Sequence, residues 1–303
     1  MTIAERLKNL SVPEGKIDVV LDTDAYNEID DQFAIAYMLK SKDKLNVKAI
    51  YAAPFFNDRS SGPEDGMVRS YNEILKLLSL MDEKVDAFEG SRGFLQNETT
   101  PMVSPAAEDL VKKAKDYSTE NPLYVVAIGA ITNVASALIL DPTIAEKIVI
   151  VWLGGHGHHI RQNAHEFNMR GDYAAARVVM RSGAPFVQLP CSGVVSSFTI
   201  SKPELEYWLK GKNPLATYLA ENTIEEAEKY ASGKPWTRII WDVTAVAWLL
   251  NDGDRFMLSR IVPTPIPTYE GFYSFDQNGL PMQYVYYIKR DALMTDLIKK
   301  LIE

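Results

Sequence analysis

Two kinds of hydrophobic pattern alternate along the chain. Short runs of apolar and β-branched residues are typical of buried strands, and longer stretches with apolar residues at every third or fourth position are typical of helices. The predicted strands are 17–21, 45–52, 123–128, 147–153 and 185–189. The predicted helices are 29–40, 66–80, 104–117, 132–140, 172–181, 214–230 and 242–250. This alternation predicts an α/β fold, in which a mostly parallel central sheet carries helices on both faces.

No repeat, Gly/Ser-rich linker or abrupt change of composition divides the chain. We therefore predict a single domain that spans residues 1–303. In a parallel sheet of this kind, ligands bind outside the carboxyl ends of the strands. The residues that follow each predicted strand are therefore the first candidates for function.

Composition narrows the function classes. The chain is 47% hydrophobic and 24% charged, as is usual for a soluble globular protein. Its net charge of −8 disfavours nucleic acid as a partner, because such binding depends on neutralising phosphates. Its one cysteine, Cys191, excludes an intrachain disulfide and is interpreted as a small buried residue. Neither a signal peptide nor an apolar run of about 20 residues is found, so we expect a cytoplasmic protein without membrane contact.

Acidic residues are concentrated directly after the first predicted strand. Four Asp and one Glu fall within ten residues, at Asp22, Asp24, Glu28, Asp30 and Asp31. One interpretation is cap chemistry, in which Asp30 is the N-cap of the next helix and the helix dipole favours Asp31. That accounts for only one or two acids, and crowded carboxylates raise each other's pKa values unless a cation lies between them. Hard oxygen ligands suit Ca²⁺ or Mg²⁺ rather than zinc, so we favour a divalent-cation site.

Four segments in order resemble those of one enzyme family. Asp22-Thr23-Asp24, a loop and Asp30-Asp31 before an apolar helix resemble the signature of the inosine-uridine preferring nucleoside hydrolases. The three later segments that resemble the family are 128–133 (Ile-Gly-Ala-Ile-Thr-Asn), 166–168 (Glu-Phe-Asn) and 241–243 (Trp-Asp-Val). The resemblance covers residues 17–250 and implies a Rossmann-like nucleoside hydrolase fold.

The resemblance also implies roles for individual residues. It implies that Ca²⁺ is bound by the side chains of Asp24, Asp31 and Asp242 and by the carbonyl of Thr132, with Asp22 as a supporting acid. It implies ribose contacts from Asp30, Asn57, Asn168 and Glu166, of which Glu166 reaches the 5′ side. The implied partner is a small nucleoside or ribosyl substrate, and the implied assembly is a homodimer or homotetramer.

The implied reaction is calcium-dependent hydrolysis of the N-glycosidic bond of ribonucleosides to base and ribose. Such a bond breaks through a state in which positive charge develops on the sugar. A bound cation lowers the pKa of its water, and Asp24 is placed to take the proton of that water. Carboxylates and amides around the ribose hydroxyls orient the sugar and stabilise its charge.

This sequence departs from the family pattern at three places. Five residues, 25–29, separate Asp24 from Asp30, where the family commonly has three with a Gly, which brings Tyr26, Asn27 and Glu28 within reach of the pocket. An expected pocket Asn falls on Ile160, and Asn163 lies nearby but out of register.

The third departure concerns the leaving base. Many relatives have a His directly before the last Asp, and this chain has Trp241. Trp does not serve as a proton donor, but it stacks on a base, and Trp236 lies in an apparent loop just before it. We therefore hypothesise that Trp241 binds the base and that purine nucleosides are preferred over pyrimidine nucleosides. Tyr230 and most other aromatic residues of this region are interpreted as helix-packing residues.

All four His residues fall between positions 156 and 165, after a predicted strand. Pocket residues and a polar surface loop are equally good interpretations of this cluster, and a zinc site is a minor one. Two alternatives to a hydrolase also remain at this point. Leu21-Asp22-Thr23-Asp24 fits the nucleophile motif of haloacid-dehalogenase-type phosphatases, although no second Asp pair supports it. A non-catalytic ribose or nucleoside binder would explain Trp241 but not the retained acids.

Overall fold

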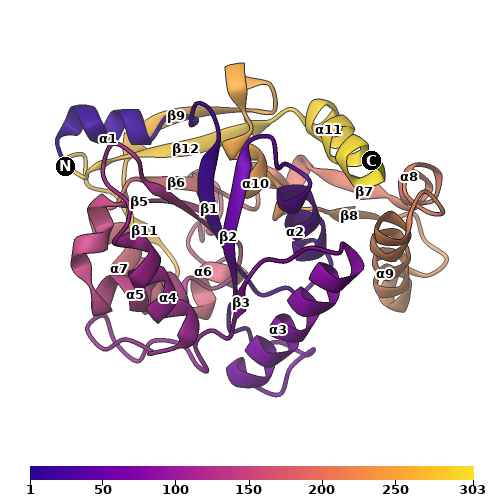
Figure 1. The fold of residues 1–303 in the computed structure, drawn as a ribbon, viewed down its shortest axis with the longest axis horizontal. Coiled ribbons are helices and arrows are strands. Elements are labelled where there is room, and N and C mark those ends of the chain that lie inside the picture. Colours follow the sequence, from indigo (N-terminus) through magenta and orange to yellow (C-terminus); the bar gives the residue numbers. More distant parts are fainter.

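An eight-stranded sheet lies at the centre of the computed structural model, which describes residues 1–303 (Figure 1). The strand order is β3-β2-β1-β4-β5-β6-β12-β9, and every neighbouring pair is parallel except β12 with the edge strand β9. These strands are β1 (Ile17–Thr23), β2 (Leu45–Ala52), β3 (Ala87–Phe88), β4 (Leu123–Ala127), β5 (Ile148–Leu153), β6 (Phe186–Leu189), β9 (Met257–Pro263) and β12 (Pro281–Ile288). The predicted α/β fold with a mostly parallel sheet is confirmed.

Helices cover both faces of this sheet. They are α1 (Ile3–Asn9), α2 (Asp31–Leu39), α3 (Pro63–Leu80), α4 (Pro105–Ala114), α5 (Thr132–Leu140), α6 (Phe167–Gly171), α7 (Tyr173–Arg181), α8 (Lys202–Trp208), α9 (Pro214–Ala231), α10 (Val243–Leu249) and α11 (Arg290–Ile302). Alternate residues of β1 enter two separate hydrophobic cores. Val19 and Leu21 pack in the core with α2, α10 and α11, and Val20 packs in the core with α4, α5 and α7.

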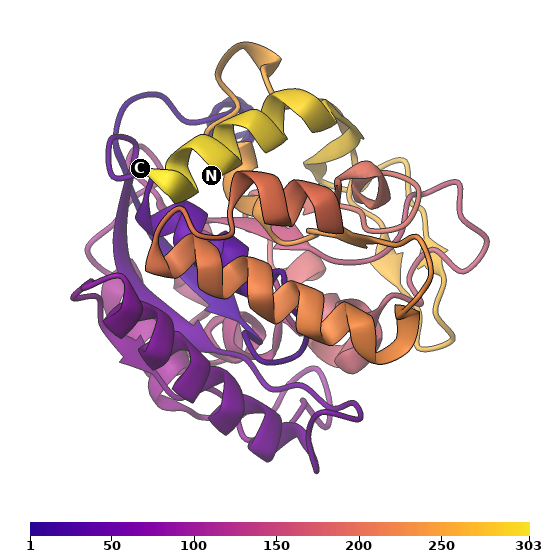
Figure 2. The same cartoon turned by 90° about the vertical axis from the view of Figure 1, so that its right-hand side faces the viewer.

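Smaller elements complete the fold. Two short antiparallel pairs join β7 (Thr199–Ser201) to β8 (Thr237–Ile239) and β10 (Ile266–Pro267) to β11 (Tyr273–Ser274). Single 3₁₀ turns form at Pro142–Glu146, Val195–Ser197 and Asp252–Asp254. Figure 2 shows α11, α8 and α9 beside one another on one side of the molecule. None of the helices combines the length and the hydropathy that a membrane span requires.

Some helices begin with a side-chain cap and others do not. The side chain of Ser104 accepts a hydrogen bond from a backbone N–H of α4, and Asn213 does the same for α9. Asp30 and Asp242 occupy the N-cap positions of α2 and α10, but neither side chain makes a capping hydrogen bond. Asp30 is thus the N-cap residue that the sequence predicts, but its carboxylate makes no capping hydrogen bond and is left for another role.

Several elements lie outside the sequence prediction. The predicted helix at 29–40 begins at Asp31, and no element was expected for α1 or for residues after 250. There, β12 joins the sheet beside β6, and β9 extends it by one antiparallel strand. Both strands are only partly buried and mix polar with apolar residues, so neither has the continuous apolar run of the central strands.

Candidate active site

A cavity of about 190 Å³ lies at the carboxyl ends of the central strands, the edge at which a ligand site is expected. Its walls come from the segments that follow β1, β4, β5 and β6 and from the starts of α6 and α10. The lining residues are Asp24, Asn27, Glu28, Asp30, Ile128, Leu153, His156, Glu166, Phe167, Asn168, Cys191, Ser192, Trp241 and Asp242.

Three buried carboxylates meet at one side of this cavity. One oxygen each from Asp30, Asp31 and Asp242 lie within 4.8 Å of one another, and no other three His, Cys, Asp or Glu side chains of the chain are grouped in this way. They meet because α2 and α10 both begin here, and a helix N-terminus favours negative charge. Asp31 also accepts a hydrogen bond from the Thr23 hydroxyl. This triad is the candidate metal centre.

Asp24 lies next to the triad and has no partner of its own. Both of its carboxylate oxygens are buried without a hydrogen bond, and the side chain is packed so closely that a Cβ added to Gly129 would lie 2.9 Å from its Cγ. Asp22 lies deeper, where Oδ1 accepts from Asn133 Nδ2 at 2.7 Å and Oδ2 is unpartnered. An ionised carboxylate buried in this way is costly unless a cation accompanies it. The unpartnered oxygens therefore fit a bound divalent cation.

The electrostatics of the cluster agree with this fit. Burial raises the pKa of Asp22 to about 7 and the pKa of Asp31 to about 6. Burial, followed by the charges of Asp31 and Asp30, raises the pKa of Asp24 well above its usual range, and burial with neighbouring carboxylates does the same for Asp242. Such acids hold protons when no cation is present and release these protons when a cation binds. All of the donors are hard oxygens, which suit Ca²⁺ or Mg²⁺.

The opposite wall of the candidate site is built around Glu166 and Asn168. The Glu166 carboxylate caps α6 and accepts from the backbone N–H groups of Asn168 and Met169, and also from that of Gly155. Asn168 Nδ2 donates to the carbonyls of Ile128 and Leu153, each at 3.0 Å, which ties the ends of β4 and β5 together. Both side chains are buried and line the cavity, so both are placed to meet a ligand.

Five of the site residues assigned from the sequence do not line this cavity, and one of them is Asp31, which belongs to the buried triad. Asp22 lies behind it, and Thr132 begins α5 with its hydroxyl donating to Asp172 Oδ2 at 2.8 Å. Asn57 Nδ2 instead donates to Asn27 Oδ1 at 2.6 Å, on the side of an adjoining cavity. Asn163 is a structural residue here, because its amide bonds the backbone of His158 and Tyr273. Whether Asn163 contacts a ligand stays a prediction.

The four His residues between positions 156 and 165 include both a cavity residue and surface residues. His156 lines the cavity, whereas His159 and His165 are exposed. His158 packs among Tyr273, Phe275 and Tyr284, and burial lowers its pKa to about 4. No group of three metal-binding side chains includes a His.

Of the two tryptophans near the expected base, only one reaches the cavity. Trp241 lines it, but Trp236 packs against the hydrophobic core and donates Nε1 to Glu228 at 3.3 Å. Trp236 is therefore wrongly placed by the sequence interpretation. Tyr230, interpreted as a helix-packing residue, is 61% exposed and lines the adjoining cavity instead.

Sequence reasoning missed several residues of this region. Phe167 and Cys191 line the cavity. Phe167 directly follows Glu166 of the 166–168 motif, and Cys191 lies two residues after the end of β6. Asn133 was quoted only as part of a motif, but its Nδ2 joins Asp22 to the Ala52 carbonyl and its Oδ1 accepts from Ser91. Cys191 is buried as expected, and burial raises the pKa of its thiol well above the usual range, which makes it a poor nucleophile.

Comparison with known proteins identifies the class to which this fold and site belong. A family model described as inosine-uridine preferring nucleoside hydrolase matches residues 65–280. This range begins after the acidic cluster at 22–31, so the match is independent of those acids. The chain belongs to the inosine-uridine preferring nucleoside hydrolase family.

Individual relatives are distant. The pyrimidine-specific ribonucleoside hydrolase RihA of Escherichia coli O1:K1 / APEC is 26% identical over 263 residues, which cover 78% of this chain and 80% of RihA. A solved inosine-guanosine nucleoside hydrolase superposes with a TM-score of 0.76 at 19% identity, covering 94% and 98% of the two chains. The type III effector XopQ, solved with adenosine diphosphate ribose, superposes with a TM-score of 0.67 at 16% identity over 100% and 99%. The nucleoside hydrolase fold predicted from the sequence is confirmed.

Proposed function

We propose that this protein is a calcium-dependent nucleoside hydrolase, which splits the N-glycosidic bond of a ribonucleoside to give free base and ribose. The observation that carries this proposal is the group of acids at the cavity edge. Asp24 is buried with two unpartnered oxygens beside the triad of Asp30, Asp31 and Asp242. Family membership supplies the reaction class to which such a site belongs.

In this proposal the acids hold the ion and Asp24 also moves a proton. The proposed ligands are Asp24, Asp31, Asp242 and the carbonyl of Thr132, with Asp22 supporting them from behind. Asp30, the third member of the triad, lines the cavity and is assigned to the sugar instead. Bound Ca²⁺ supplies positive charge that lowers the pKa of the attacking water. Asp24 accepts a proton from that water while the water oxygen bonds to the anomeric carbon of ribose. The bond from that carbon to the base nitrogen breaks, its electron pair remains on the base, and the base takes up a proton.

The other cavity residues orient the sugar. We assign Asp30 and Asn168 to ribose hydroxyls and Glu166 to the 5′ side, because all three line the cavity. Their negative and polar groups stabilise the positive charge that the sugar develops. Trp241 lines the same cavity and is assigned to the face of the base. His156 is the one His that lines the cavity, so it is the His placed to protonate the base.

A second candidate function is binding of a ribosyl ligand without turnover. It is favoured by Trp241, which replaces the expected proton donor, and by the similarity in fold to an effector solved with adenosine diphosphate ribose. The family match leaves the phosphatase alternative without support.

A substrate panel separates these functions. Calcium-loaded protein is incubated with inosine, guanosine, uridine, cytidine, adenosine diphosphate ribose and a phosphatase substrate, and both ribose and phosphate release are measured. Ribose release from at least one nucleoside, without phosphate release, is the expected result. Tight binding of a ribosyl ligand without any release would establish the binding protein instead.

A further inference from the structure

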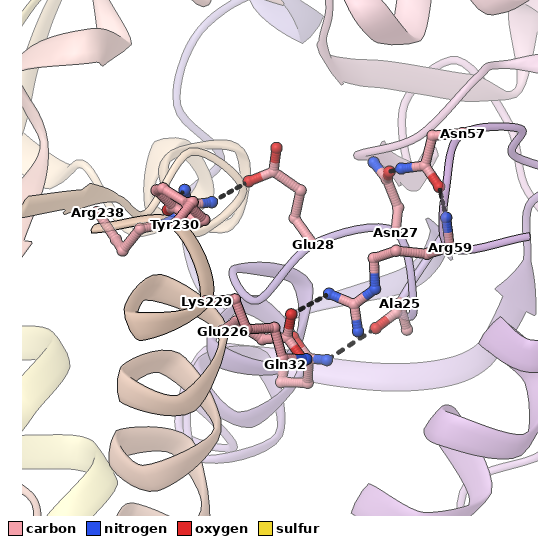
Figure 3. A network of polar contacts seen from close by, with 10 residues as sticks. All are labelled: Ala25, Asn27, Glu28, Gln32, Asn57, Arg59, Glu226, Lys229, Tyr230 and Arg238. Carbon is pink, nitrogen blue, oxygen red and sulfur yellow. Dashed lines mark hydrogen bonds and ion pairs between the residues drawn. The ribbon is translucent and has the colours of Figure 1, made fainter. Parts of the chain in front are cut away.

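A second cavity, of about 640 Å³, adjoins the candidate active site. The two share Asn27 and Glu28, from the loop between β1 and α2 that is longer than in the family pattern. The cavity is bounded by that loop, by residues 57–69 after β2, and by the end of α9 with β8 (Figure 3). Two other cavities beside the candidate active site share only one lining residue each with it, so the second cavity shares the most lining residues with the candidate active site.

Cations gather on the walls of this second cavity, although the chain has a net charge of −8. They are Arg59, Arg69, Lys229 and Arg238. The guanidinium groups of Arg59 and Arg69 lie 4.7 and 5.7 Å from the centre of the Tyr26 ring, and that of Arg238 lies 5.6 Å from the centre of the Tyr230 ring. Planar cations on aromatic faces bind planar anionic groups well, because they combine stacking with forked hydrogen bonds.

Three carboxylates, those of Glu28, Asp58 and Glu226, also line the cavity. Arg69 is already paired with Asp65 through Nε at 2.8 Å, so the incompletely paired cations are Arg59 and Arg238. Glu226 is shared between Lys229 and Arg59, and its contact with Arg59 Nη1 is 3.6 Å, too long for a good hydrogen bond. Arg238 pairs with Glu28 through Nη2, but its Nε is buried and has no acceptor (Figure 3). A carboxylate that enters the cavity therefore gives Arg59 the close acceptor that Glu226 does not provide.

We propose that this second cavity receives the leaving group, and that it selects an aromatic leaving group that carries a carboxylate. This inference rests on the proposed hydrolase function, since it assigns the part of the substrate that is released. The first cavity holds the ribose and the inner part of the leaving group, whose face lies on Trp241, and the far end of that group extends past Asn27 and Glu28 into the second cavity. Arg59 and Arg238 then bind the carboxylate at that far end, beside Tyr26 and Tyr230. Glu226 of α9 is the carboxylate nearest to Arg59 in the structure.

Matched substrate pairs test this selection. Orotidine and uridine differ by one carboxylate on the base, and nicotinate riboside and nicotinamide riboside differ by a carboxylate in place of a carboxamide. The quantity measured is the ratio of kcat/KM for the acidic to the neutral member. Arg59→Gln and Arg238→Gln are each expected to lower this ratio about tenfold or more, because each removes a charge-assisted hydrogen bond. Arg59→Lys is expected to recover only part of it, because lysine keeps the charge but not the fork.

Arg92→Gln is the matched control, because Arg92 is exposed and lies outside both cavities. It is expected to keep the wild-type ratio. Hydrolysis with the same ratio in wild type, Arg59→Gln and Arg238→Gln would overturn the inference and leave the proposed function standing.

If no nucleoside is hydrolysed, the proposed hydrolase function is contradicted, and the acidic subsite is then tested by a binding measurement. Titration calorimetry then compares orotate with uracil. Tighter binding of orotate that is lost in Arg59→Gln supports the acidic subsite, and equal binding of both bases would contradict it.

Discussion

At the scale of single residues, the proposed chemistry depends most on Asp24. Its carboxylate is buried, unpartnered and adjacent to three other acids. Asp24→Asn keeps the shape of the side chain but removes the proposed base and one negative charge. We expect kcat to fall by about 10² to 10⁴, because that is the usual contribution of a general base. A variant that binds metal and keeps activity within tenfold of wild type would show that Asp24 is not the base.

A second prediction at this scale concerns Trp241, which lines the cavity where the family pattern has a His. Stacking on an aromatic side chain is worth about 1–3 kcal/mol per base, and purines present the larger face. We expect inosine to have a higher kcat/KM than uridine, and Trp241→Ala to reduce that ratio. A wild-type preference for uridine, or an unchanged ratio in the variant, would assign the base contact to other residues.

At the scale of elements, the start of α5 holds the site together. Asn133 joins the ends of β1 and β2 and the segment after β3 through buried hydrogen bonds to Asp22, Ala52 and Ser91. Asn133→Ala leaves these partners unsatisfied, so we expect the free energy of unfolding to fall by about 2–4 kcal/mol in urea denaturation. Asn46→Ala is the control, because Asn46 is exposed, and it should cost less than about 0.5 kcal/mol. Equal losses in the two variants would remove Asn133 from this role.

Elements with a regular hydrophobic pattern were predictable from the sequence, and so were the acids that follow β1. The central strands are continuous apolar runs, whereas the edge strand β9 and its neighbour β12 mix polar with apolar residues, so their pairing depends on the rest of the sheet. The meeting of Asp242 with Asp30 was available only through the family resemblance. Arg59 and Arg238 lie about 180 positions apart and carry no shared motif, so only the folded chain brings them to one cavity.

At the scale of the whole molecule, the acidic cluster links metal binding, proton binding and stability. Folded-state pKa values above the unfolded values mean that the metal-free protein loses stability as the pH rises through about 6 to 7, where Asp31 and Asp22 ionise. Bound Ca²⁺ accepts these ionised carboxylates as ligands and should offset the loss. We therefore expect the increase in Tm on adding Ca²⁺ to be larger at pH 8 than at pH 6. An equal increase at both pH values would contradict this linkage, and Asp242→Asn should reduce it at pH 8.

The central claim is that the buried acids hold a calcium ion on which nucleoside hydrolysis depends. The most direct measurement removes metal with a chelator, dialyses the chelator away, and follows ribose release from inosine and uridine as Ca²⁺, Mg²⁺ or Zn²⁺ is added back. The same samples are assayed for bound metal by elemental analysis. We predict no release from the metal-free protein and recovery that saturates at one Ca²⁺ per chain. Full activity without metal, recovery with Zn²⁺ alone, or one bound Ca²⁺ without any ribose release would contradict the claim.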